Sequence, residues 1–357
     1  MDFWLKMILA AAVAFGISFA MTPPVKGFAE QVGAIDVPKE ARRVHDHPIP
    51  RMGGLAIFLG FMLTALLFVQ LNTQVTGILI GAIIIAVMGA VDDIVSLNAW
   101  IKLAGQIVAA VVAIRCGVVF SYITNPNFLS GITTISIGWL SVPLTLLWII
   151  ACTNAMNLID GLDGLAVGVA SISALTMLVV SLIVSEPTVS LLLAALTGAC
   201  LGFMPFNLNP AKIFMGDVGS QLLGFVLSTV SILGLFKLHA VITFFVPLLA
   251  LALPLADTAF AFFRRILRGE SPFHPDRGHL HHRLLALGMS QKQVVAVMYG
   301  VSAVLGLIAV LLTGKSPILR VVCLALAFAV SIAVWLYVFR KNPNLRLPHH
   351  GEEEKTQ

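Results

Sequence analysis

The chain has 357 residues, of which 59% are hydrophobic and 11% are charged, and its mean hydropathy is +0.98. A soluble domain carries about 25% charged residues, so this composition excludes a soluble globular protein and indicates one that crosses a membrane several times. The formal net charge of +5 becomes informative only when the cations are assigned to the two sides of that membrane. The four cysteines lie in or near apolar runs without CxxC spacing, which indicates core residues rather than disulfides or a metal site.

A membrane-spanning helix needs about 20 mostly apolar residues. The first apolar run is followed rather than preceded by basic residues, which favours a retained helix with its amino end outside over a cleaved signal peptide. In the ninth run we expect a kink near Pro254, because proline removes a helical hydrogen bond. We predict about eleven transmembrane helices in an all-α polytopic protein, at roughly 3–22, 53–71, 76–91, 100–118, 138–153, 165–185, 187–205, 220–236, 239–263, 293–313 and 317–339.

The distribution of Lys and Arg predicts which loops lie on each side of the membrane. With the amino terminus outside, the cytoplasmic segments hold 17 of the 22 Lys and Arg residues, as the positive-inside rule requires. Residues 1–340 then form one membrane domain, and residues 341–357 form a polar cytoplasmic tail. On the outer side, the partly alternating run Ile132–Ile137 predicts a small external hairpin.

The same topology gathers the acids on the cytoplasmic side, whereas the outer side holds only Asp2 and Glu186. Carboxylates at a membrane edge are costly, and they mark function by default. One-sided clustering suggests a shared site formed by Asp92, Asp93, Asp160, Asp163, Asp217 and Asp257.

A polar stretch from Asn154 to Gly164 separates the fifth and sixth apolar runs and combines two amides, two carboxylates and two glycines. Turn formation alone explains these residue types. Glycine also lets the backbone approach a ligand closely. Because the topology puts this stretch beside the other acids, we interpret it as one wall of the shared site.

Asp92 and Asp93 are adjacent carboxylates at the end of the third run. At about 4 Å their repulsion is about 4 kcal/mol at an effective dielectric of about 20. This repulsion is small if the pair is solvated or if a cation neutralises it. A solvated helix end and a Mg²⁺ site are both consistent with the pair.

The segment from Asn207 to Ser220 again combines amides, a carboxylate and glycines just before a helix. Asp217 and Ser220 suit a helix cap, and the backbone amides of the same segment suit an anion. Phe214 suits either stacking on a flat base or anchoring of the loop in the interface.

The last inner loop, Ser271 to Arg283, holds four of the nine histidines and two arginines. Without a nearby cysteine, this cluster favours a diphosphate over zinc, and contact with lipid headgroups stays open. Arg51, in the segment Pro48–Gly54, suits a phosphate or a lipid headgroup.

Together the motifs resemble the polyprenyl-phosphate N-acetylhexosamine-1-phosphate transferases over nearly the whole chain to about residue 340. This resemblance implies ten or eleven helices and an active site on the cytoplasmic face of the cell membrane. It also implies Mg²⁺ dependence, with Mn²⁺ as a substitute, and transfer of a sugar 1-phosphate from a UDP-sugar to undecaprenyl phosphate with release of UMP. It rests on Pro48–Gly54, Asp92–Asp93, Asn154–Gly164, Phe214–Ser220 and the histidine loop.

The resemblance also implies roles for single residues. Asp217 is then a metal ligand, and Asp92 and Asp93 lie at the lipid phosphate and the metal, with Asp92 activating the nucleophile. The nucleotide-side pocket is formed by Asn154, Asn157, Asp160, Gly161, Leu162, Asp163, Asn207 and Phe214. The sugar-diphosphate contacts come from His274, Arg277, His279, His281, His282 and Arg283.

Two details favour the branch that transfers GlcNAc 1-phosphate and initiates teichoic acid or a related envelope glycan. These are Pro50-Arg-Met-Gly-Gly and His279-Leu-His-His-Arg283, which depart from the pattern typical of the phospho-MurNAc-pentapeptide transferases. That peptidoglycan enzyme is the alternative. A cation-coupled transporter is a further one, although its acids would lie nearer the midplane. The expected partners are the bilayer, UDP-N-acetylhexosamine and undecaprenyl phosphate; no nucleic acid is expected, and a homodimer stays open.

Overall fold

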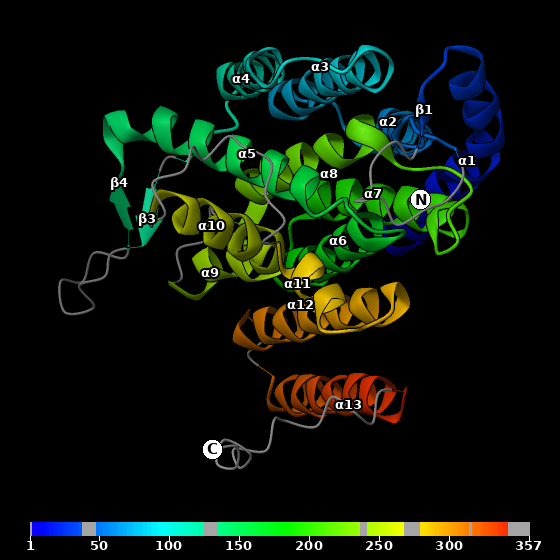
Figure 1. Ribbon diagram of the computed structural model, residues 1–357. Helices are drawn as coiled ribbons and strands as arrows, with labels where there is room; N and C mark the ends of the chain where they lie inside the picture. Colours follow the sequence, from blue (N-terminus) through cyan, green and yellow to red (C-terminus); the bar gives the residue numbers. More distant parts are fainter. Residues whose placement is uncertain are drawn as a thin grey trace.

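The computed structural model describes residues 2–37, 48–120, 122–124, 134–235, 241–267, 279–313 and 316–341. Across these ranges the chain is almost entirely helical, as the sequence predicts (Figure 1). The helices are α1 Phe3–Gln31, α2 Gly54–Phe68, α3 Thr73–Val95, α4 Ala99–Arg115, α5 Ser141–Leu158, α6 Leu165–Ile183, α7 Pro187–Asn207, α8 Gly216–Val230, α9 Val241–Ala250, α10 Ala252–Leu267, α11 Leu280–Ala286, α12 Gln291–Thr313 and α13 Pro317–Lys341.

Two small antiparallel strand pairs accompany the helices. Strands β3 (Tyr122–Thr124) and β4 (Thr134–Ser136) pair where the sequence predicts a hairpin. Strands β1 (Ile35–Asp36) and β2 (Ile49–Pro50) form a second pair, in a segment where the sequence predicts no strand. Figure 1 shows β3 and β4 at one end of the molecule and β1 at the other.

Seven helices within the described residues are long and apolar enough to cross a membrane, so the protein is a multi-pass membrane protein. The shorter apolar helices Gly54–Phe68 and Ile318–Val334 accompany them. The total of eleven spans and the side on which each terminus lies stay predictions. The seven are Phe3–Gln31, Thr73–Val95, Gly138–Leu158, Leu165–Ile183, Pro187–Asn207, Gly216–Gly234 and Gln291–Thr313.

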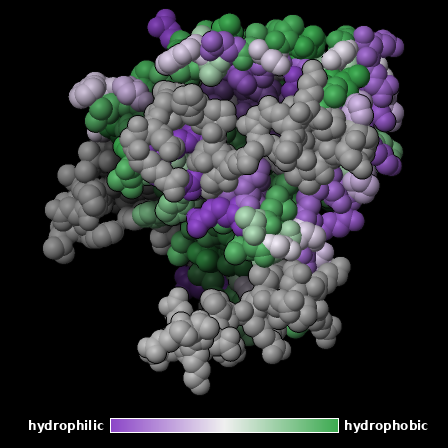
Figure 2. All heavy atoms as spheres, viewed as in Figure 1, coloured by the Kyte–Doolittle hydropathy of each residue, from purple (hydrophilic) through white to green (hydrophobic). Residues whose placement is uncertain are grey.

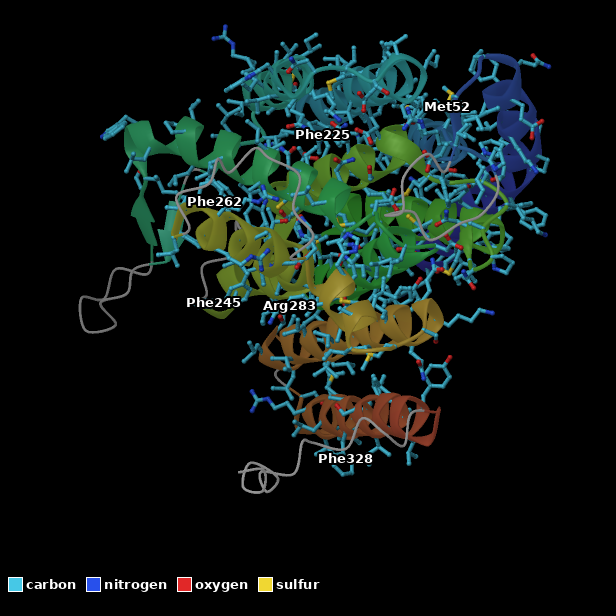
Figure 3. All side chains as sticks on the ribbon, viewed as in Figure 1. Met52, Phe225, Phe245, Phe262, Arg283 and Phe328 are labelled. Carbon is cyan, nitrogen blue, oxygen red and sulfur yellow. The ribbon has the colours of Figure 1, made fainter. Side chains whose placement is uncertain are left out.

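Helix α8 lies at the centre of the bundle and is the most buried of these spans. It packs against α2, α3 and α5, while α13 packs against α12 at the periphery (Figure 1). Phe225 on α8 is fully buried, whereas Phe328 on α13 is 69% exposed. Both side chains are labelled in Figure 3. Exposed apolar side chains of this kind suit contact with lipid.

The ninth apolar run breaks as predicted. Helix α9 ends at Ala250 and α10 begins at Ala252, so Pro254 lies in the first turn of α10. Proline has no N–H to donate to the carbonyl four residues earlier. That carbonyl belongs to Ala250, and the Ser173 hydroxyl on α6 donates to it at 2.5 Å. A neighbouring helix therefore satisfies the group that the proline leaves unpaired.

Two of the boundaries that differ from the sequence expectation, and one helix that it lacked, show how tertiary contacts shape the chain. Helix α1 continues through Pro23 and Pro24 to Gln31, where Val25 and Ala29 are buried against other helices. Helix α8 begins at Gly216 rather than near residue 220, which puts Asp217 in its first turn. A short helix, α11, begins within the predicted histidine loop and extends three residues beyond it.

Candidate functional site

Lys102 joins two of the predicted acids. Its ammonium nitrogen lies 3.0 Å from Oδ2 of Asp92, at the end of α3, and 3.0 Å from Oδ2 of Asp217, at the start of α8. The Lys102 side chain is 27% exposed, so the pair that it bridges is open to water on one side. Two carboxylates 125 residues apart therefore share one cation, and this offsets the repulsion between them.

Asp93 has a different environment from its neighbour. Its Oδ1 accepts a hydrogen bond from the backbone N–H of Asp217 at 3.0 Å, and its Oδ2 accepts one from Val218 at 3.3 Å. These amides belong to the first turn of α8, where backbone donors have no partner within the helix. Gly216 precedes them with φ of +71°, and a Cβ there would lie 2.3 Å from the Asp93 carboxylate. Asp93 thus caps α8 from α3.

A chain of amides connects the Asn154 stretch to Asp217. The side chain of Asn154 donates to Oε1 of Gln106 at 2.7 Å, and Gln106 donates to Oε1 of Gln221 at 2.9 Å. Gln221 then donates to Oδ2 of Asp217 at 3.0 Å. Because both glutamines are buried, each amide needs these partners.

The turn between α5 and α6 is fastened to the loop between α7 and α8. Oδ2 of Asp163 accepts from the Asn209 side chain at 2.9 Å and from the backbone N–H of Ala211 at 3.1 Å. The buried Asn207 accepts from Gly164 N at 3.2 Å and donates to the carbonyl of Ile213 at 3.0 Å. Asp163 and Asn207, two of the predicted nucleotide-side residues, therefore shape the loop that leads into α8.

Asp160 lies in the same turn, between two apolar spans. Burial, together with the negative charges of Asp217 and Asp93, raises the pKa of Asp160 to about 8. A carboxyl with such a pKa carries its proton at neutral pH and can donate a hydrogen bond. In the same region, Asn157 donates from its side chain to Ser220 at 2.8 Å, which ties α5 to α8.

The Pro48–Gly54 segment lies alongside the Phe214 segment. Phe214 donates its N–H to the carbonyl of Pro50 at 2.8 Å, and Gly54 donates to Met215 at 2.7 Å. A Cβ at Gly54 would lie 2.0 Å from the nitrogen of Gly219, so only glycine permits this approach. Arg51 donates from Nε to the backbone carbonyl of Asp93 at 3.0 Å and so binds the carboxyl end of α3.

The histidine loop reaches the site through α11. His281 is 1% exposed, and a Cβ built on Gly161 would lie 2.6 Å from its Nε2. Burial lowers the pKa of His281 to about 4, so its ring is neutral at pH 7. His279 lies behind it, with its Nδ1 3.0 Å from Oδ2 of Asp257 on α10. The predicted residues His274 and Arg277 lie outside the described residues.

The predicted residues fit a divalent cation at one place. Within the described part of the chain, no three His, Cys, Asp or Glu side chains form a ready metal cluster. However, Asp92 and Asp217 already hold one cation between them, and hard carboxylate oxygens are the ligands that Mg²⁺ prefers. A divalent ion bound there would have to replace the Lys102 ammonium.

Some functional candidates were missed although the sequence carried a signal for them. Lys102 and Gln106 are polar residues four positions apart within an apolar run, and Gln221 follows Asp217 by four positions. Polar groups four positions apart share one helix face, and polar groups inside a membrane indicate a functional site. Asp257 was assigned to the acidic side, but its partner 22 residues away in the sequence could not be read from any spacing.

The described helices and the site define a multi-pass membrane protein with an acidic polar site, where segments far apart in sequence meet. Figure 2 shows hydrophilic residues concentrated on the side of the molecule away from the β3–β4 hairpin. Residues 75–235 match the family described as "Glycosyl transferase family 4". This match spans α3 through the segment that follows α8, and so contains Asp92, the α5–α6 turn and Asp217.

Relatives extend the likeness over most of the chain. A Bacillus subtilis protein named "Probable undecaprenyl-phosphate N-acetylglucosaminyl 1-phosphate transferase" is 39% identical over 309 residues, which cover 86% of this chain and 85% of that protein. The "Decaprenyl-phosphate N-acetylglucosaminephosphotransferase" of Mycobacterium tuberculosis is 37% identical over 324 residues, with 82% and 79% covered. An Escherichia coli K12 "Undecaprenyl-phosphate alpha-N-acetylglucosaminyl 1-phosphate transferase" is 28% identical over 287 residues, with 79% and 77% covered.

The chain belongs to glycosyl transferase family 4, among the polyprenyl-phosphate N-acetylhexosamine-1-phosphate transferases. The resemblance drawn from the five motifs is thereby confirmed.

Proposed function

We propose that the protein transfers GlcNAc 1-phosphate from UDP-GlcNAc to undecaprenyl phosphate at the cytoplasmic face of the plasma membrane, and releases UMP. The names of the relatives support the lipid acceptor and the N-acetylglucosaminyl group. The structural observation that carries the proposal is the shared cation of Asp92 and Asp217, next to the α5–α6 turn. We further propose that the product initiates teichoic acid or a related envelope glycan.

The chemistry needs charge neutralisation more than a strong base. The lipid phosphate is a monoester with a second pKa of about 6, so it is largely ionised at neutral pH. Its oxygen attacks the phosphorus that bears the sugar, the bond to the bridging oxygen breaks, and UMP leaves with that oxygen. Bound Mg²⁺ would draw the phosphate oxygens together and offset the charge that develops on them.

The residues of this chain have separate roles in that step. Asp92 and Asp217 would hold the divalent ion, and Lys102, once released from them, would remain close enough to pair with a phosphate oxygen. The protonated Asp160 would donate a hydrogen bond rather than repel the donor. Direct attack by the lipid phosphate requires no covalent enzyme intermediate.

The test uses the purified full-length chain in lipid nanodiscs with undecaprenyl phosphate, labelled UDP-GlcNAc and Mg²⁺. We expect release of UMP and a labelled lipid diphosphate, and loss of both when EDTA is added. UDP-GalNAc and UDP-MurNAc-pentapeptide serve as competing donors. No UMP release by folded protein would refute the proposal, and preferred use of UDP-MurNAc-pentapeptide would reassign it to the peptidoglycan enzyme.

Asp217→Asn should abolish turnover without unfolding the protein. The amide keeps an acceptor for Gln221 or Lys102 but removes the charge that a divalent cation requires. Glu30→Gln is the matched control, because Glu30 is an exposed acid that pairs with Lys26 on the same helix. Near-normal UMP release by Asp217→Asn would refute a metal role for this carboxylate.

A further inference from the structure

Asp257 uses both of its carboxylate oxygens on one short helix. Asp257 lies on α10, and its side chain is 4% exposed. Its Oδ2 lies 3.0 Å from Nδ1 of His279, and its Oδ1 accepts a hydrogen bond from the backbone N–H of Leu280 at 2.7 Å. The carboxylate thus holds the first residues of α11 at two points.

Helix α11 depends on such contacts for its position. It has seven residues, Leu280–Ala286, and a helix of this length is not stable alone in water. Leu284 and Leu285 pack against the hydrophobic core, which fixes one face of α11. Arg283, labelled in Figure 3, lies on α11 beside α10 and α12 and is exposed. Packing of the leucines holds α11 against the core, and Asp257 holds the position of its first residues.

Two stacked histidine rings extend the contacts of Asp257 from α10 to the α5–α6 turn. The rings of His279 and His281 are stacked, with centroids 5.9 Å apart and an interplanar angle of 9°. On its other side, His281 lies against Gly161, where a Cβ would come within 2.6 Å of Nε2. Asp160 and Asp163 flank Gly161 in this turn. Asp257, His279, His281 and Gly161 therefore form one continuous row of contacts.

His281 also has an unused polar atom. Its Nδ1 is buried and has no hydrogen-bond partner among the described residues. A buried polar nitrogen without a partner is costly. Such a nitrogen suits a bound group that supplies the missing hydrogen bond.

We propose that Asp257 is a positioning residue, which sets α11 against the α5–α6 turn so that the histidine end of the site meets the sugar-nucleotide donor. The kinetic part of this inference rests on the proposed transferase function. The structural part, that the carboxylate orders α11, does not depend on it.

The first experiment measures hydrogen exchange of the full-length protein in nanodiscs. Asp257→Asn is nearly isosteric, and it keeps one oxygen for Leu280 while losing the charge that faces His279. We expect faster exchange in the peptide covering residues 279–287, with α12 unchanged. Asp257→Glu should restore part of the protection, and Glu30→Gln should match the wild type. Unchanged exchange at 279–287 in Asp257→Asn would overturn the proposal whatever the activity of the enzyme.

The second experiment separates positioning from a loss of fold by measuring UMP release against each substrate. Asp257→Asn should raise the KM for UDP-GlcNAc about tenfold, which corresponds to about 1.4 kcal/mol, and leave the KM for undecaprenyl phosphate within about twofold. Gly161→Ala, which pushes on His281 from the opposite side, should give the same split. Gly27→Ala is its control, because a Cβ there meets nothing within 4 Å.

A double substitution checks whether the two partners act as a unit. If Asp257 works through His279, Asp257→Asn combined with His279→Gln should be no worse than the more damaging single change. Additive losses, or equal losses for both substrates, would overturn the positioning role. If the wild type itself releases no UMP, the proposed function fails, and hydrogen exchange still decides whether Asp257 orders α11.

Discussion

Asp93 can act either as a ligand of the metal or lipid phosphate or as a structural cap of α8, and its replacement distinguishes these two roles. The family resemblance implies a place at the metal or the lipid phosphate. In the structure both oxygens of Asp93 accept backbone hydrogen bonds from the first turn of α8, and the residue is 2% exposed. We therefore predict that Asp93→Ala and Asp93→Asn destabilise the protein, whereas Asp217→Asn mainly removes activity.

The magnitude follows from the groups left unpaired. Asp93→Ala leaves the N–H groups of Asp217 and Val218 without an acceptor, and each buried unsatisfied donor costs about 1–3 kcal/mol. The expected loss for Asp93→Ala is therefore about 2–6 kcal/mol, from these two donors. Asp93→Asn keeps one acceptor and turns an NH₂ group toward the other donor, so about 1–3 kcal/mol is expected. Arg51 adds little, because its Nε lies 3.7 Å from Oδ1 and its side chain is partly exposed.

The assay is SDS titration of the protein in mixed micelles, which gives the free energy of unfolding for each variant. The expected order of stability is wild type, then Asp93→Asn, then Asp93→Ala, with Glu30→Gln equal to the wild type. Turnover of the Asp93 variants should fall as well, because the cap positions Asp217. The reasoning is refuted if Asp93→Asn unfolds like the wild type while it loses activity and Mn²⁺ binding, since Asp93 would then be a metal ligand.

Two further substitutions test other contacts of the site. Lys102→Met should abolish turnover and raise the affinity for Mn²⁺ at least about tenfold, because an ammonium no longer competes for the shared carboxylate oxygens; Mn²⁺ binding followed by electron paramagnetic resonance checks this, and an unchanged affinity would contradict it. Gly54→Ala should cost about 1–3 kcal/mol through overpacking, since the new methyl group would lie 2.0 Å from a backbone nitrogen. Thermal unfolding measures that loss against Gly16→Ala, where nothing lies within 4 Å, and equal stability of the two variants would contradict it.

The sequence was sufficient to predict the helical class, the broken ninth run and the outer hairpin, because each depends on local composition. Apolar length specifies a span, and a proline specifies a missing hydrogen bond, whatever lies elsewhere in the chain. The convergence of Asp92, the α5–α6 turn and Asp217 was also within reach, because charge bias assigns loops to sides and so restricts which acids can meet.

The partners of those acids could not be predicted, because they depend on how helices rotate and pack. Nothing local indicates that Asp93 turns toward the start of α8 while Asp92 turns toward Lys102. The short helix α11 was missed because its polar residues suggested a loop, although Leu280 and Leu284 are spaced as on one helical face. Tertiary contacts, rather than propensity, fix such a segment.

The partners also decide which acids can exchange one cation for another. Asp93 and Asp163 accept backbone amides, and withdrawing either carboxylate would leave a buried N–H unpaired. Asp92 also accepts a backbone amide, from Leu97 at 2.6 Å, but it does so through Oδ1 and binds Lys102 through Oδ2. The ammonium that Asp92 and Asp217 share lies on a long, partly exposed stem, and it can move to water or to a phosphate without unpairing that N–H. A divalent cation can therefore enter between Asp92 and Asp217 while the other carboxylates keep α8 and the loop before it in place. The cluster of acids that the topology predicts thus divides into a pair that is free to exchange its cation and a frame that holds this pair in position.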